Sequence, residues 1–140
     1  MNNEALELLL GIGIVVLLFS ALIGIVVAVL YLLTLQNLLK VVATENRVIE
    51  PGKVWLMLIP LFSLVYSFIL YPKISESLKN EFLKRGLADN GDYGKSLGTA
   101  MAVLGLCGFI PVLGGFASIA YFVIWIIYWV KMSEYKSKLS

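Results

Sequence analysis

The feature that most limits how this chain can fold is a set of long stretches without any Asp, Glu, Lys or Arg. These charge-free stretches cover residues 8–39, 54–71 and 96–130. Of the 140 residues, 60% are hydrophobic and 14% are charged, whereas soluble domains carry roughly 25% charged residues. A soluble domain of this length exposes too much surface to bury such stretches. We therefore expect an all-α integral membrane protein.

The lengths of these stretches set the number of membrane segments that we expect. A spanning helix needs about 20 apolar residues, and the first stretch exceeds the ~30 Å hydrocarbon core, so it must tilt or protrude. The last stretch breaks near Pro111 into two parts, each short enough to form a shallow hairpin. The predicted fold is a polytopic membrane helical bundle, a single membrane domain over residues 1–140 with segments at about 5–39, 54–71, 96–111 and 115–130.

A polar segment between the second and third membrane segments predicts one further helix. Its apolar residues recur every four positions and form a single stripe, at Ile74, Leu78 and Phe82. Glu81 precedes Arg85 by four residues, a favourable ion-pair spacing on a helix. We expect Pro72 to begin a separate amphipathic helix over about 73–85 that lies on the membrane surface.

The basic residues predict which side of the membrane each connector occupies. With four spans, eight of the 11 lie on the side of both termini, and three lie in the first connector. The positive-inside rule then places both termini in the cytoplasm, at the cytoplasmic membrane. Pro60 lies inside the second segment and should kink it. In the alternative topology, residues 54–71 are therefore re-entrant and the N-terminus is external. All 11 basic residues are then cytoplasmic, and the acidic N-terminal tail also favours this arrangement.

The sequence offers little chemistry. It contains no histidine, and the charge-free stretches supply no ionisable group to relay a proton. No Ser-His or Cys-His couple and no metal-binding motif occurs, and we interpret the lone Cys107 as a small packing residue. The net charge of +2 is too small to indicate nucleic acid as a partner. We predict no catalytic residue, no cofactor and no metal site.

Two groups of small residues predict close helix packing. Ser20, Gly24 and Ala28 are spaced four residues apart in the first segment, and Gly98 and Ala102 repeat this spacing in the third. Small residues on one face let helix backbones approach closely in lipid. They indicate either an interface with a partner or a second copy, or packing within this one bundle.

The basic residues of the polar segment are candidate ligands for anionic lipid headgroups. They are Lys73, Lys79, Lys84 and Arg85, and each is worth about 1 kcal/mol near an anionic surface. The alternative is that they only mark the cytoplasmic side. Hydroxyl groups in the segments could likewise line a water path between assembled copies, or simply hydrogen-bond nearby carbonyls. These are Thr34, Ser63, Tyr66, Ser67 and Tyr121.

Three passages of the sequence carry a resemblance. They are Asn46 to Phe62, which includes Asn-Arg, Pro-Gly and Ile-Pro-Leu-Phe; Ser77 to Phe82 with Arg85-Gly86; and Ile126 to Lys131. Over roughly residues 30–138, the chain resembles a group of small bacterial multi-pass membrane proteins of unknown function. The resemblance implies a bacterial cytoplasmic membrane and carries over no activity and no catalytic residue.

These observations favour a non-enzymatic accessory or scaffold subunit that packs against another membrane protein or against itself within the lipid bilayer. The alternative is a homo-oligomeric channel or a membrane-perturbing effector. A lipid-linked enzyme would need a catalytic group that the sequence does not contain.

Overall fold

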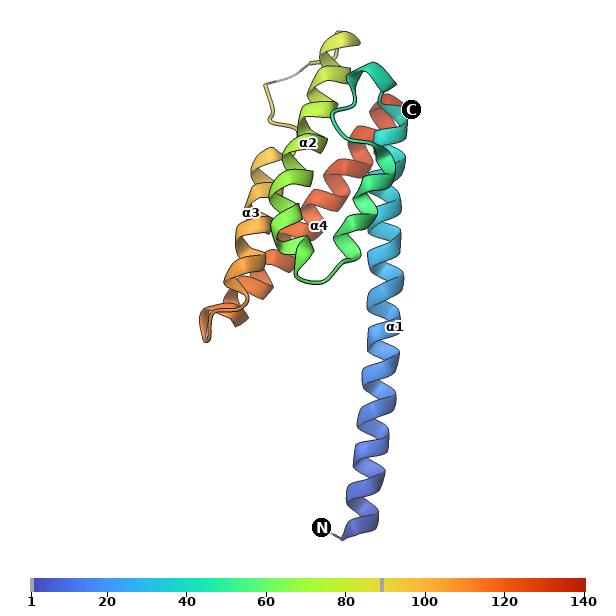
Figure 1. The fold of residues 1–140 in the computed structure, drawn as a ribbon, viewed down its shortest axis with the longest axis vertical. Coiled ribbons are helices and arrows are strands. Elements are labelled where there is room, and N and C mark those ends of the chain that lie inside the picture. The colour runs from blue at the N-terminus through green and yellow to red at the C-terminus, as the bar shows by residue number, and fades with distance from the viewer. Residues whose placement is uncertain (1, 89) are drawn as a thin grey trace. The chain divides into compact units, whose positions relative to one another are not determined.

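The computed structural model describes residues 2–88 and 90–140. Over these residues the protein is helical and contains no strand, which confirms the all-α prediction. The elements are α1 (Asn3–Val41), the 3-10 helices η1 (Thr44–Asn46) and η2 (Pro51–Leu58), α2 (Phe62–Lys84), α3 (Lys95–Cys107) and α4 (Leu113–Leu139) (Figure 1).

The chain divides into two compact units, the first ending at Leu32 and the second covering Leu33–Ser140, where the sequence predicts a single domain. The first unit is the greater part of α1, and every side chain from Leu8 to Val26 is exposed. Because this helix is apolar on all sides, it has no single stripe to turn toward a protein core.

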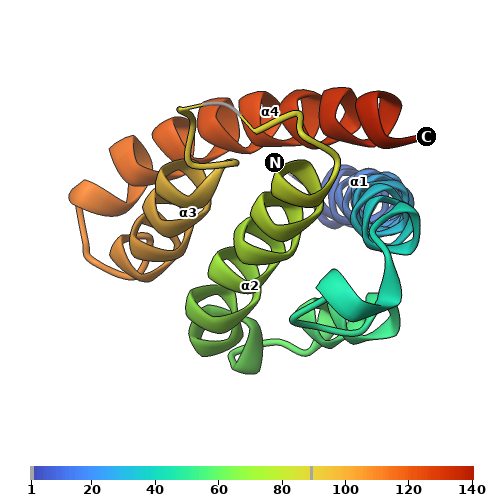
Figure 2. The same ribbon diagram turned by 90° about the horizontal axis from the view of Figure 1, so that it is seen from above.

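The second unit is a helical bundle. α2 packs against both η2 and α3, and α3 packs against α4, as the view along the bundle shows (Figure 2). Its core contains aromatic pairs that join α2 to α4. The rings of Tyr71 and Tyr128 lie 5.0 Å apart edge to face, and those of Phe82 and Tyr135 lie 5.5 Å apart. Such edge-to-face pairs add to the burial of apolar area.

The predicted segment 54–71 does not form one helix. η2 ends at Leu58, Leu61 has a positive φ of 64°, and α2 begins at Phe62. The chain reverses here, and the hydroxyl of Tyr66 donates to the carbonyl of Lys53 at 2.8 Å across the turn. The sequence predicts that Pro60 kinks a single helix, but it lies instead in a turn between two limbs, η2 and α2, that pack against each other.

The predicted separate amphipathic helix over 73–85 is wrong, because Pro72 lies inside α2. Its apolar stripe is buried in the bundle, at Ile74, Leu78 and Phe82, so the stripe cannot lie on a membrane. Proline removes one helix hydrogen bond. The burial of Tyr71 before it and Ile74 after it compensates for that loss and keeps the helix continuous.

The last two helices lie close to the predicted segments 96–111 and 115–130, with one extension. α4 continues for more than two turns beyond Val130 and ends at Leu139. Met132, Tyr135 and Leu139 are buried at helical spacing on this extension, so packing rather than lipid accounts for its length.

Two of the helices are long and apolar enough to cross a bilayer, namely α1 and α4. Their most apolar 18-residue windows are 0% and 11% buried, respectively. The core helix of a soluble protein would be mostly buried, so neither helix matches that description. Four separate membrane segments are not established by the fold.

Candidate functional site

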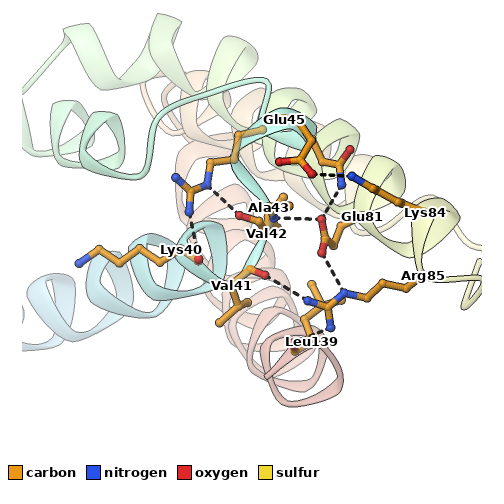
Figure 3. Close-up of polar contacts among 11 residues, drawn as sticks. Lys40, Val41, Val42, Ala43, Glu45, Glu81, Lys84, Arg85 and Leu139 are labelled. Atoms are coloured by element: carbon orange, nitrogen blue, oxygen red, sulfur yellow. Dashed lines mark hydrogen bonds and ion pairs between the residues drawn. The ribbon is translucent and has the colours of Figure 1, made fainter.

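The charged end of the second unit contains a network that we name the polar junction, made by Asn46, Arg47, Glu81 and Arg85 (Figure 3). Arg47 lies against the end of α1. Its Nε donates to the carbonyls of Leu39 and Val42 at 2.8 and 2.9 Å, and its Nη2 donates to the carbonyl of Lys40 at 3.0 Å. Carbonyls at a helix C-terminus lack partners within the helix and carry partial negative charge. Arg47 therefore caps α1.

Glu81 is the acceptor at the centre of the polar junction and is only 4% exposed. One carboxylate oxygen accepts from the backbone N–H of Ala43 at 2.9 Å and from Nδ2 of Asn46 at 2.7 Å. The other accepts from Nε of Arg85 at 2.8 Å, which confirms the predicted ion pair on α2. Glu81 thereby fixes the connector after α1 to the end of α2.

These contacts also set the ionisation of Glu81. Burial alone would raise the pKa of its carboxyl group. The hydrogen bonds from Asn46, Ala43 and Arg85 outweigh burial and hold the pKa below its ordinary value. The carboxylate is therefore charged at neutral pH and remains a strong acceptor.

Arg85 joins three helices. Besides Glu81, its guanidinium donates to the carbonyl of Leu139 at the end of α4 at 2.7 Å, and more weakly to that of Val41 at the end of α1 at 3.4 Å. A cation at two helix C-termini complements both helix dipoles. The donors of Arg85 that face the protein are thus engaged in structure.

The four predicted headgroup residues differ in their surroundings. Lys84 forms an ion pair with Glu45, and Arg85 belongs to the polar junction. Lys79 is exposed and Lys73 is half-buried. Lys79 therefore has an exposed ammonium group for an anionic ligand, whereas Lys84 and Arg85 already have protein partners.

The two predicted packing faces also differ. Gly98 and Ala102 are buried, and a Cβ on Gly98 would lie 2.5 Å from Cβ of Tyr71, so this face packs within the bundle. On α1, Ser20 and Gly24 are exposed, Ala28 is half-buried, and no atom lies within 4 Å of the position of a Cβ on Gly24. The face on α1 is open over most of its length.

Most of the hydroxyl groups singled out in the sequence bind protein atoms nearby. Ser67 donates to the carbonyl of Ser63 one turn back at 2.6 Å, and Tyr66 donates to Lys53 across the turn. Thr34 accepts from Nε1 of Trp129 at 3.0 Å. Ser63, Ser67 and Tyr121 also line a groove of about 390 Å³ between the helices. The hydroxyls with these bonds serve packing rather than a water path.

No group of three or more His, Cys, Asp or Glu side chains that could hold a metal ion occurs among the described residues. Cys107, a half-buried free thiol, ends α3. A comparison of the chain with protein-family models, curated protein sequences and solved structures finds no match. Among the described residues, the arrangement offers polar anchoring and helix packing.

Sequence reasoning missed the capping role of Arg47 and the central role of Glu81. The spacing between Glu81 and Arg85 predicts their ion pair. The bonds from Ala43 and Asn46 to Glu81 span 38 and 35 residues of sequence, so no local pattern predicts them. The available signal for Arg47 was its position a few residues after a long helix, where a cation favours the C-terminal dipole.

Proposed function

We propose that this protein is a non-enzymatic integral membrane protein of the cytoplasmic membrane, an accessory or scaffold subunit that packs against a membrane partner or against itself. The observation that carries the proposal is the open apolar surface of α1. Its side chains from Leu8 to Val26 are all exposed. A soluble protein rarely exposes so large an apolar patch, so lipid or another membrane protein is its natural environment.

The open face on α1 is the proposed contact with a partner or a second copy. Ser20, Gly24 and Ala28 follow one another at intervals of four residues and lie on one side of the helix. The equivalent small residues Gly98 and Ala102 already pack within the bundle. The face on α1 has the same character and is open at Gly24, so a helix from outside this chain would complete it.

The alternative is a homo-oligomeric channel, in which several copies surround a polar path. The groove that contains Ser63, Ser67 and Tyr121 favours it. Against it, the hydroxyl of Ser67 is committed to a backbone carbonyl. Ion flux through liposomes that contain the purified protein separates the two proposals, because a scaffold leaves the bilayer tight.

The test is native mass spectrometry of the protein extracted gently from its own membrane, with two matched variants. Gly24→Leu places a bulky side chain on the open face. Gly11→Leu makes the same change about 140° away around the helix, at 100° per residue, and Gly11 also has no neighbour within 4 Å. We expect a stoichiometric protein partner or a homo-oligomer, weakened tenfold or more by Gly24→Leu and unchanged by Gly11→Leu.

A protein that is monomeric and free of partners in every extract would overturn the accessory proposal. Equal weakening by both glycine variants would show that association does not use the small-residue face.

A further inference from the structure

Two turns in the second unit share a geometry and a sequence pattern, Ile-Pro followed by two apolar residues. The first is Ile59-Pro60-Leu61-Phe62 and the second is Ile110-Pro111-Val112-Leu113. Leu61 and Val112 have φ of 64° and 70° with ψ of −47° and −54°. In each turn the residue after this position donates its N–H to the proline carbonyl, at 2.7 and 2.8 Å. Both are therefore γ-turns with positive φ, a rare and strained form.

Each turn joins two limbs that run antiparallel. In the first hairpin, η2 and the start of α2 are held together by the bond from Tyr66 to Lys53. In the second, α3 and α4 approach closely at both ends. A Cβ on Gly114 would lie 2.5 Å from the carbonyl oxygen of Gly108, and one on Gly94 would lie 2.7 Å from Cε of Met132. Both turns lie at the same, lower end of residues 33–140 (Figure 1).

The end of the unit that carries the two turns is apolar and open. Leu61 is 71% exposed and Val112 is 85% exposed. Valine and leucine are unusual at positive φ, where a turn in water would normally have glycine or asparagine. The choice of apolar residues at strained positions indicates that these turns contact hydrocarbon rather than water.

Charges are confined to the opposite end of the hairpins. No charged residue lies between Lys53 and Lys73 or between Lys95 and Lys131. Each hairpin therefore has a lysine at both of its open ends, which we call its feet. Lysines commonly mark the level at which a chain leaves the hydrocarbon. The polar junction lies beyond this level, at the ends of α1, α2 and α4.

The descending limbs are too short to cross a bilayer. η2 has eight residues and α3 has 13. At about 2.0 Å per residue for a 3-10 helix and 1.5 Å for an α-helix, they measure roughly 16 and 20 Å. The hydrocarbon core is about 30 Å thick. A limb that starts at a lysine in the interface therefore ends within the hydrocarbon. The returning limb in α4 is long enough to cross, so in the second hairpin it must run obliquely to meet the shorter α3.

Most of the backbone at the turns fits that environment, while the amides of Leu61 and Val112 donate no backbone hydrogen bond among the described residues. Proline has no N–H to satisfy. The amides of Phe62 and Leu113 donate within the γ-turns, and the next amides, of Ser63 and Gly114, donate to the carbonyls of Ile59 and Ile110 at 3.0 and 2.7 Å. Irregular backbone at membrane depth requires such internal partners.

We propose that residues 51–71 and 95–130 are two re-entrant hairpins that enter the bilayer from one face and return to it, with the γ-turns at Pro60 and Pro111 in contact with lipid acyl chains. This inference rests on the proposed membrane location and replaces the four-span topology with the re-entrant alternative, extended to both hairpins. The connectors and the C-terminal part of α4 then share one face of the membrane.

Site-directed labelling of single cysteines tests the proposal in a Cys107→Ser background. Gly52→Cys and Lys79→Cys report the feet of the hairpins, and Leu61→Cys and Val112→Cys report the turns. A membrane-impermeant maleimide is applied to sealed vesicles of each orientation, and then in detergent. We expect Gly52→Cys and Lys79→Cys to react from the same face, and both turn positions to react only in detergent.

A fluorophore on each turn cysteine, quenched by lipids that carry a nitroxide along the acyl chain, adds a positive measurement of depth. We expect the strongest quenching from nitroxides deep in the chain. Phe109→Cys and Phe116→Cys flank the second turn and replace Val112→Cys if that variant does not fold.

Labelling of Gly52→Cys and Lys79→Cys from opposite faces would overturn the first hairpin. Labelling of a turn in sealed vesicles of either orientation would overturn the hairpin to which that turn belongs. Release of the protein from membranes by alkaline carbonate would instead refute the membrane location itself, so the two failures are distinguishable.

Discussion

Replacing Glu81 with glutamine tests whether the polar junction holds the second unit together. The substitution keeps the shape of the side chain and exchanges one carboxylate oxygen for an NH2 group. If the remaining oxygen keeps its bonds to Ala43 and Asn46, the NH2 group faces Nε of Arg85, donor against donor. In the opposite orientation, two bonds are lost instead of one.

The magnitude follows from these bonds. A hydrogen bond to a charged group contributes about 1.5–3 kcal/mol. Arg85 is 37% exposed, so its bond to Glu81 belongs at the lower end of that range. We expect Glu81→Gln to lower the free energy of unfolding by about 2 kcal/mol. Glu81→Ala loses all three bonds and should cost about 4 kcal/mol, as for a broken buried ion pair.

The assay is reversible unfolding in mixed detergent micelles, followed by circular dichroism. Glu76→Gln is the matched control, because Glu76 is exposed on the same helix and lies more than one turn before Glu81. We expect it to change the free energy by less than about 0.5 kcal/mol. If Glu81→Gln is no less stable than Glu76→Gln, the polar junction does not stabilise the fold and the reasoning is refuted.

Two further predictions concern pH and packing. Because the folded-state pKa of Glu81 lies below its ordinary value of 4.5, the stability it contributes is present above that value and is lost as pH falls through the folded-state pKa. Unfolding midpoints measured from pH 7 to pH 3 should converge for the native protein and Glu81→Gln, and a constant difference would contradict this. Gly98→Ala should destabilise the bundle by about 1–3 kcal/mol through overpacking, since its Cβ would meet Tyr71. Gly105→Ala, with its nearest contact at an ordinary 3.7 Å, should not destabilise it in the same unfolding assay.

The amino-acid sequence predicted the helices that follow from charge-free stretches, and it misjudged two prolines. It treated Pro60 as a kink and Pro72 as a helix start, whereas the chain turns at the first and remains helical through the second. Proline rules are local, but these outcomes depend on distant contacts. The bond between Tyr66 and Lys53 holds the reversal, and the burial of the stripe after Pro72 holds the helix.

The polar junction shows the same limit. The spacing of Glu81 and Arg85 along one helix is a local pattern and was predictable. The bonds from Asn46 and Ala43 to Glu81, and from Arg85 to Leu139, bring together three separate regions of the chain. Nothing in the residue types of those regions identifies their partners before the fold is known.

The turn at Pro60 also bears on the way membrane topology is counted from hydropathy. Each crossing inverts the side assigned to every residue downstream, so the assignment depends on whether the number of crossings is odd or even. A hairpin of two short limbs, counted as one 18-residue span, changes that parity. In this chain a single such miscount at 54–71 would exchange the sides assigned to the polar segment that follows it and to the C-terminal end of α4.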